Sequence, residues 1–167
     1  GCWAHARRKF NEAIKALPPS ARADGGAAAK QGLTFCNSLF AIERALRDAT
    51  PEERKAARLE RSEPVLTSFK EWLDAHAAMA LPKTVFGQAV NYCLNQWDKL
   101  VVFLQDGRLE LDNNRSERSI KPFVIGRKNW LFANTPSGAR ASATIYSLVE
   151  TAKENGLNPF DYLTHLF

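Results

Sequence analysis

A short stretch of the sequence combines side chains that can hold a metal ion with side chains that can bind phosphate. Residues 112–118 read Asp-Asn-Asn-Arg-Ser-Glu-Arg. In a helix, four polar residues from this region would lie at i, i+3, i+4 and i+7 and share one face: Asn114, Glu117, Arg118 and Lys121. A carboxylate between amide and cationic neighbours is suited to holding a divalent metal ion beside a phosphate.

The same residues also fit a purely structural explanation. Glu117 and Lys121 have the i,i+4 spacing of an ordinary helical ion pair. Asp112 can cap the start of a helix from about residue 113 to 124, with its side chain accepting a hydrogen bond from the first turn. Spacing alone favours this simpler explanation.

The positive charge of the chain is concentrated around this stretch. The 167 residues carry a net charge of +5. Between residues 113 and 140 the only acid is Glu117, and the basic residues are Arg115, Arg118, Lys121, Arg127, Lys128 and Arg140. Arg7 and Arg8 belong to a second, smaller basic run. Such clustering is typical of proteins that bind a nucleic-acid backbone, although a solvated basic face would look the same.

Composition indicates a globular protein with a hydrophobic core. The sequence is 45% hydrophobic and 10% aromatic. No apolar run approaches the ~20 residues of a membrane span, and no signal-peptide pattern is present, so we expect a cytoplasmic protein without membrane contact. Three widely separated cysteines fit a reducing compartment, and the Cys2–His5 pair is too few ligands for zinc. Because the chain begins with Gly1, we expect it to be part of something longer.

Apolar residues recur at helical spacing along most of the chain. Seven helices are predicted, over about residues 4–17, 27–47, 51–80, 84–105, 113–124, 137–155 and from 159 onward. Thr50 should cap the third helix, Pro64 should kink or divide it, and the charged stretch 52–63 should face solvent. The fold class we predict is mainly α with a few short strands (α+β), the strands falling at about 1–3, 109–111 and 130–132.

Three blocks of the sequence resemble the insertion-sequence-66 transposase family. They are Gly-Cys-Trp-Ala-His-Ala-Arg-Arg-Lys-Phe at 1–10, the segment 91–97 with 103–114, and the segment from 117 to 159 that includes Ile-Gly-Arg-Lys-Asn-Trp-Leu-Phe at 125–132. Their order and spacing are highly specific. Residues 18–83 share only a helical character with the family.

The resemblance implies a DDE transposase, which cleaves phosphodiester bonds and transfers strands with three carboxylates and two magnesium ions on an RNase H-like core. The last carboxylate of the family falls on Glu117, as catalytic residue and Mg²⁺ ligand. The two aspartates of the family lie upstream of the block at 1–10. We therefore expect a fragment that is inactive alone, with a partial RNase H-like core at 1–17 and 106–167 and a helical insertion at 18–105.

The resemblance also implies partners and contacts. DNA at transposon ends would be the partner. The protein would act in the cytoplasm of a bacterium, associated with the nucleoid. A homo-oligomer of the longer protein is compatible with the resemblance. The residues expected to contact DNA are Arg115, Arg118, Lys121, Arg127, Lys128, Trp130, Arg7 and Arg8. Trp130 could stack on an unpaired base or belong to the core, and Arg7 and Arg8 could instead form structural ion pairs.

Two other interpretations remain open. The chain could be a helical DNA-binding module without catalysis, which salt-dependent but metal-independent DNA binding would favour. It could also be a helical interaction domain without a nucleic-acid role, which absence of DNA binding at low salt would favour. Neither alternative predicts the block order from 112 to 159.

Overall fold

A computed structural model describes residues 1–19, 26–126, 133 and 135–167. The chain divides into two compact units, Gly1–Asn113 (unit 1) and Asn114–Phe167 (unit 2). Helices dominate both units, which confirms the predicted helical character. No helix in the described ranges is long and apolar enough to cross a membrane.

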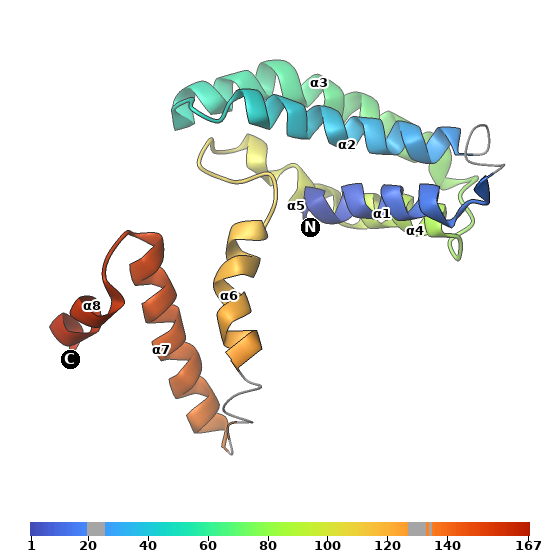
Figure 1. The fold of residues 1–167 in the computed structure, drawn as a ribbon. Helices are drawn as coiled ribbons and strands as arrows, with labels where there is room; N and C mark the ends of the chain where they lie inside the picture. The colour runs from blue at the N-terminus through green and yellow to red at the C-terminus, as the bar shows by residue number, and fades with distance from the viewer. Residues whose placement is uncertain (20–25, 127–132, 134) are drawn as a thin grey trace. The chain divides into compact units, whose positions relative to one another are not determined.

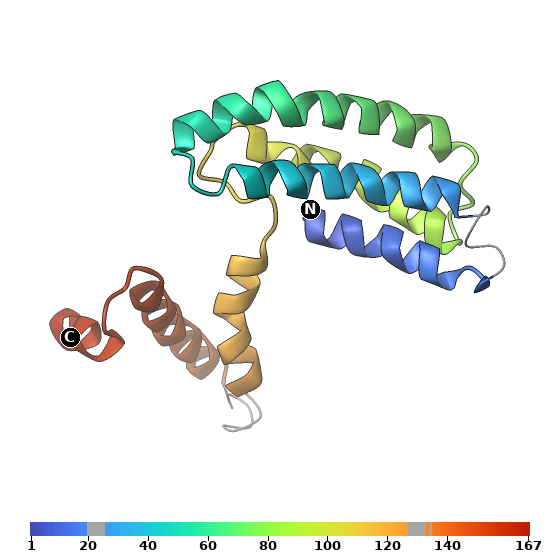
Figure 2. The same cartoon turned by 45° about the horizontal axis from the view of Figure 1, so that its top comes forward.

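The described residues of unit 1 form a helical bundle. Its elements are α1 (Trp3–Ala16), α2 (Ala27–Ala45), α3 (Pro51–Ala77), α4 (Val85–Asn95), α5 (Trp97–Leu100) and the 3-10 helix η2 (Val102–Leu104). The helix α1 packs on α2 and α4, and α3 packs on the same two helices from the other side. Figures 1 and 2 show this arrangement, with α2 and α3 running side by side.

An aromatic cluster forms the centre of unit 1. Trp3 and Phe10 of α1 are buried and meet Phe69 and Trp72 of α3. The ring centroids of Phe69 and Trp72 lie 5.8 Å apart. The indole Nε1 of Trp3 donates a hydrogen bond of 2.7 Å to the carbonyl of Leu100, so the buried polar atom is satisfied. Gly32 allows α1 and α2 to approach closely, because a Cβ there would overlap the Phe10 ring.

The long helix α3 begins as predicted but is not divided. Thr50 and Glu53 form a reciprocal capping box, in which the Thr50 side chain accepts from the backbone of Glu53. Pro64 lies inside the helix, which nevertheless continues to Ala77. Pro64 is exposed, so water can reach the carbonyl that lacks a helical donor.

The prediction that residues 52–63 face solvent throughout is wrong at two positions. Arg58 and Ser62 have no exposed surface. They extend the buried face of Leu66 and Phe69 towards the start of α3, at spacings of three and four residues. The charge of Arg58 hid this pattern, because an arginine is buried only when paired.

The described part of unit 2 contains α6 (Asn114–Gly126), α7 (Pro136–Glu154) and α8 (Pro159–Leu166). The helix α7 contacts both α6 and α8. Asn158 caps α8 by accepting a hydrogen bond from the backbone of Phe160, and Gly156 has the positive φ of 69° that ends α7.

The expected strands at 1–3 and 109–111 are absent. The helix α1 already begins at Trp3, and residues 109–111 form an irregular segment whose neighbours are a turn and a bend. Three alternating residues are too few for a strand without a partner strand, and the described residues form no sheet for them to join. The third expected strand, 130–132, lies outside the described residues. The RNase H-like core therefore rests on the resemblance alone. The division into core segments at 1–17 and 106–167 and a helical insertion at 18–105 stays a prediction.

Candidate functional site

The residues singled out first in the sequence lie on α6. This helix begins at Asn114, one residue later than predicted, so Asn113 rather than Asp112 precedes its first residue. Glu117 is in the first turn, where the positive end of the helix dipole favours a negative charge. Because the segment is helical, Arg118 and Lys121 share a face with Glu117, and all three are exposed.

Arg115, in the first turn of α6, has a protein partner. Its Nε donates to Oε2 of Glu154 at 2.6 Å, and the two side chains are 55% and 40% exposed. Together with the edge-to-face contact of Phe123 and Tyr146, at 5.3 Å between centroids, this ion pair joins α6 to α7 in antiparallel orientation. Arg115 therefore has a structural role in unit 2 in addition to any contact with DNA.

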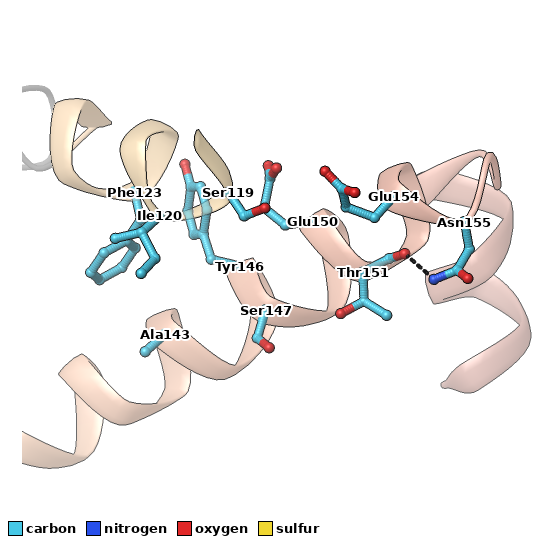
Figure 3. Close-up of a pocket in the computed structure, with 10 residues that line it drawn as sticks. All are labelled: Ser119, Ile120, Phe123, Ala143, Tyr146, Ser147, Glu150, Thr151, Glu154 and Asn155. Atoms are coloured by element: carbon cyan, nitrogen blue, oxygen red, sulfur yellow. Dashed lines mark hydrogen bonds between the residues drawn. The ribbon is translucent and has the colours of Figure 1, made fainter. Parts of the chain in front are cut away.

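A groove of about 370 Å³ lies between α6 and α7. Figure 3 shows Ile120 and Phe123 of α6 beside Tyr146 of α7, with Glu150 and Glu154 farther along α7. Glu117 is not among the residues that line it. The groove and the face of Glu117, Arg118 and Lys121 are thus separate features of unit 2.

The described residues do not supply a complete metal site. Nowhere in residues 1–19, 26–126, 133 and 135–167 do three or more His, Cys, Asp or Glu side chains come close enough to hold an ion. A pair of magnesium ions requires several carboxylate oxygens. Glu117 can provide one such ligand, and the donor set within the described ranges does not fit a pair of ions.

Two family profiles account for nearly all of the sequence. The profile of the transposase IS66 family matches residues 1–141, and that of the IS66 C-terminal element matches residues 147–167. The chain belongs to the IS66 transposase family. The resemblance found in the three sequence blocks is confirmed.

Relatives of this IS66-family chain are much longer than the chain itself. Two are uncharacterized proteins of Sinorhizobium fredii (strain NBRC 101917 / NGR234), y4hP and y4qI. They are 34% and 35% identical over 97% and 98% of this chain, which spans about 30% of their length. No solved structure matches the chain.

The remaining predicted contact residues of this IS66 transposase chain fall into two groups. Arg7 and Arg8 are exposed on α1 of unit 1. The Nε of Arg7 donates to Oδ1 of Asn37 at 2.6 Å, and its guanidinium lies 5.8 Å from the ring centre of Phe40, so Arg7 has local partners on α2. The second group, Arg127, Lys128 and Trp130, lies outside the described residues.

Sequence reasoning missed the arginines of α3 that bind backbone carbonyls. Arg54 donates to the carbonyls of Leu46, Arg47, Ala49 and Gly107. Arg58, four residues further along α3, donates to the carboxylate of Glu43 and to three backbone carbonyls. Helical spacing was the one available signal that Arg58 is buried, because Arg58 continues the apolar face of α3. Its charge had instead indicated that the side chain is exposed.

Proposed function

We propose that this chain contributes the last acidic residue, Glu117, to the active site of a DDE-type DNA transposase. The reaction would be metal-dependent cleavage and strand transfer of phosphodiester bonds. The position of Glu117 carries this proposal: it is an exposed carboxylate in the first turn of α6, within the residues that the IS66 transposase profile matches. The irregular segment before α6 leads directly into that turn.

The electrostatics of α6 support binding of a polyanion next to this carboxylate. Arg118 and Lys121 share the face of Glu117 and are exposed, so they can neutralise phosphates without desolvating a buried charge. Such contacts position DNA and do not read its sequence. In this proposal the other contacts come from Arg115, Arg127, Lys128, Trp130, Arg7 and Arg8.

The divalent metals of such enzymes activate the attacking oxygen and stabilise the leaving oxygen. Because the described residues hold too few ligands, Glu117 would serve as one Mg²⁺ ligand among carboxylates from elsewhere in the longer protein, and the chain by itself would be inactive. The same longer protein would supply the RNase H-like sheet, with residues 18–105 as a helical insertion, and would act on the chromosome in the cytoplasm. A homo-oligomer is compatible with this proposal.

The test replaces Glu117 in the longer protein that contains this sequence. Glu117→Gln removes the negative charge and keeps the shape, so cleavage of DNA carrying the transposon ends with Mg²⁺ should fall below detection. Binding of the same DNA, measured by gel shift at low salt, should stay within about twofold, since neither Arg118 nor Lys121 changes.

Glu60→Gln is the matched control, because Glu60 is an exposed glutamate on a helix of unit 1. It should cleave at the wild-type rate. Normal cleavage by Glu117→Gln would refute the assignment. Salt-sensitive DNA binding by the wild-type protein without any metal-dependent cleavage would instead favour the DNA-binding module.

A further inference from the structure

The groove between α6 and α7 is apolar along part of its length. Figure 3 shows Ile120 and Phe123 of α6 projecting towards α7, over Ala143 and beside Tyr146. Ile120 is 58% exposed. On α7 the lining residues recur every three or four positions, so one face of that helix forms a wall of the groove. Small side chains on that face, Ala143 and Ser147, leave the space open to a further element.

The two acids that line the groove are already paired within unit 2. Lys153 Nζ donates to Oε1 of Glu150 at 2.8 Å, and Arg115 Nε donates to Oε2 of Glu154 at 2.6 Å. Because these negative charges are balanced locally, a partner does not have to supply cations. Binding of a nucleic-acid backbone requires cations at the contact, and carboxylates repel phosphates. The groove therefore fits an apolar surface better than it fits DNA.

Unit 2 buries little of its own apolar surface. In its described part, Ala152 is the one buried hydrophobic residue. A helix in a folded protein owes most of its stability to packing of its apolar face, and that face is usually covered by a second layer of structure. The helices α6 and α7 form one such layer. A further element in the groove between them would complete a core for unit 2.

The length of the relatives indicates where such an element comes from. The chain spans about 30% of their length, so most of each relative lies outside the matched part. An element of the same polypeptide is present at a high effective concentration, whatever the concentration of the protein. A second copy of the chain would have to associate without that advantage.

We propose that the groove between α6 and α7 is the docking surface for an apolar segment of the longer protein, from outside these 167 residues. Ile120, Phe123 and Tyr146 would bury their exposed parts against that segment. The inference rests on the proposed function only for the longer protein, and it does not require Glu117 to be catalytic.

The first test measures whether the groove is covered in the longer protein. Ser147→Cys places a thiol in the groove, and Ser68→Cys, at an exposed serine on α3, is the matched control. Labelling with N-ethylmaleimide is followed by mass spectrometry of the peptide that carries each thiol. At Ser147→Cys it should be on the order of tenfold slower in the native protein than in urea, whereas at Ser68→Cys the two rates should be similar. Similar rates at Ser147→Cys would overturn the inference.

Three further conditions distinguish the segment from other occupants. Protection of Ser147→Cys should persist on dilution, because contact within one polypeptide does not depend on concentration. Loss of protection on dilution would assign the groove to a second copy, and protection that appears only with DNA would assign it to nucleic acid. Protection already present in the 167-residue chain alone would place the covering segment within these residues. Each of these three results would overturn the inference.

The second test weakens the contact itself. Ile120→Ser in the longer protein removes apolar surface that docking would bury, so labelling at Ser147→Cys should become on the order of tenfold faster. Leu59→Ser is the matched control, since Leu59 on α3 is an exposed apolar residue of unit 1, and it should leave that rate unchanged. An unchanged rate in Ile120→Ser would mean that the contact does not use the groove.

These outcomes are separate from those of the cleavage assay. Labelling reports on coverage of the groove and does not depend on catalysis. If Glu117→Gln still cleaves DNA, the proposed function fails and the labelling result stands. If the thiol of Ser147→Cys is unprotected in the longer protein, the docking surface fails and the assignment of Glu117 is unaffected.

Discussion

The two units of this chain differ in how they bury their apolar side chains. Within the described ranges, every buried hydrophobic residue except Ala152 belongs to unit 1. Unit 2 leaves several large apolar residues exposed, including Ile120 at 58%, Phe160 at 75% and Phe167 at 85%. Both units are helical, so secondary structure alone does not distinguish them.

The difference shows where the stability of each unit comes from. Isolated helices shorter than about 12–15 residues are marginal in water, and most helical stability in proteins comes from packing an apolar face. Unit 1 has such packing around Phe69 and Trp72. In unit 2 the helices depend on a few contacts between α6, α7 and α8. The candidate catalytic residue thus lies in the unit with the smaller core.

The strongest test of this contrast replaces one phenylalanine in each unit. Phe69 has no exposed surface and touches several aromatic rings, so Phe69→Ala should lower the free energy of unfolding of unit 1 by about 3–5 kcal/mol. Phe160→Ala, the matched change in unit 2, should alter stability by no more than about 0.5 kcal/mol. Urea denaturation followed by tryptophan fluorescence measures both. Equal losses would show that unit 2 has a core comparable with that of unit 1.

A smaller effect is expected from the ion pair that joins α6 to α7. Glu154→Gln removes the partner of Arg115, and because both side chains are partly exposed the loss should be at most about 1 kcal/mol. Amide exchange in α6 should rise modestly, and less so at high salt. Glu150→Gln is the control, since Glu150 pairs with Lys153 on its own helix and so should leave exchange in α6 unchanged. The same response to both changes would contradict a linking role for Arg115 and Glu154.

The smallest effect concerns a carboxylate at the exit of unit 1. Arg108, through side-chain and backbone hydrogen bonds, holds the pKa of Asp106 well below its ordinary value. A lowered folded-state pKa stabilises the fold above the unfolded pKa of about 3.9, and this contribution is lost as the pH falls below it. The melting temperature of the wild type should therefore be slightly higher than that of Asp106→Asn at pH 7, and the two melting temperatures should converge in acid. Thermal melts of both proteins at several pH values measure this. A difference in melting temperature that grows in acid would contradict the prediction.

Most helices could be predicted because their signals are local. The apolar spacing along α1, the cap at Thr50 and the proline at the start of α8 each depend on residues a few positions apart. The helix through Glu117 was predicted to within two residues at each end for the same reason. The strands predicted at 1–3 and 109–111 were wrong, because a strand requires a partner that three residues cannot specify.

The sequence by itself determined the family, the helical character and the face of α6 that carries Glu117, Arg118 and Lys121, because block order and helical spacing are properties of the chain alone. Only the tertiary structure revealed the burial of Arg58 and the pairing of Arg115 with Glu154, whose partners lie 15 and 39 positions away. A charged residue is buried when distant groups satisfy its donors, and their positions are set by packing. For that reason the bonds from Arg58 to the carbonyls of Phe103, Asp106 and Leu109 could not be read from spacing.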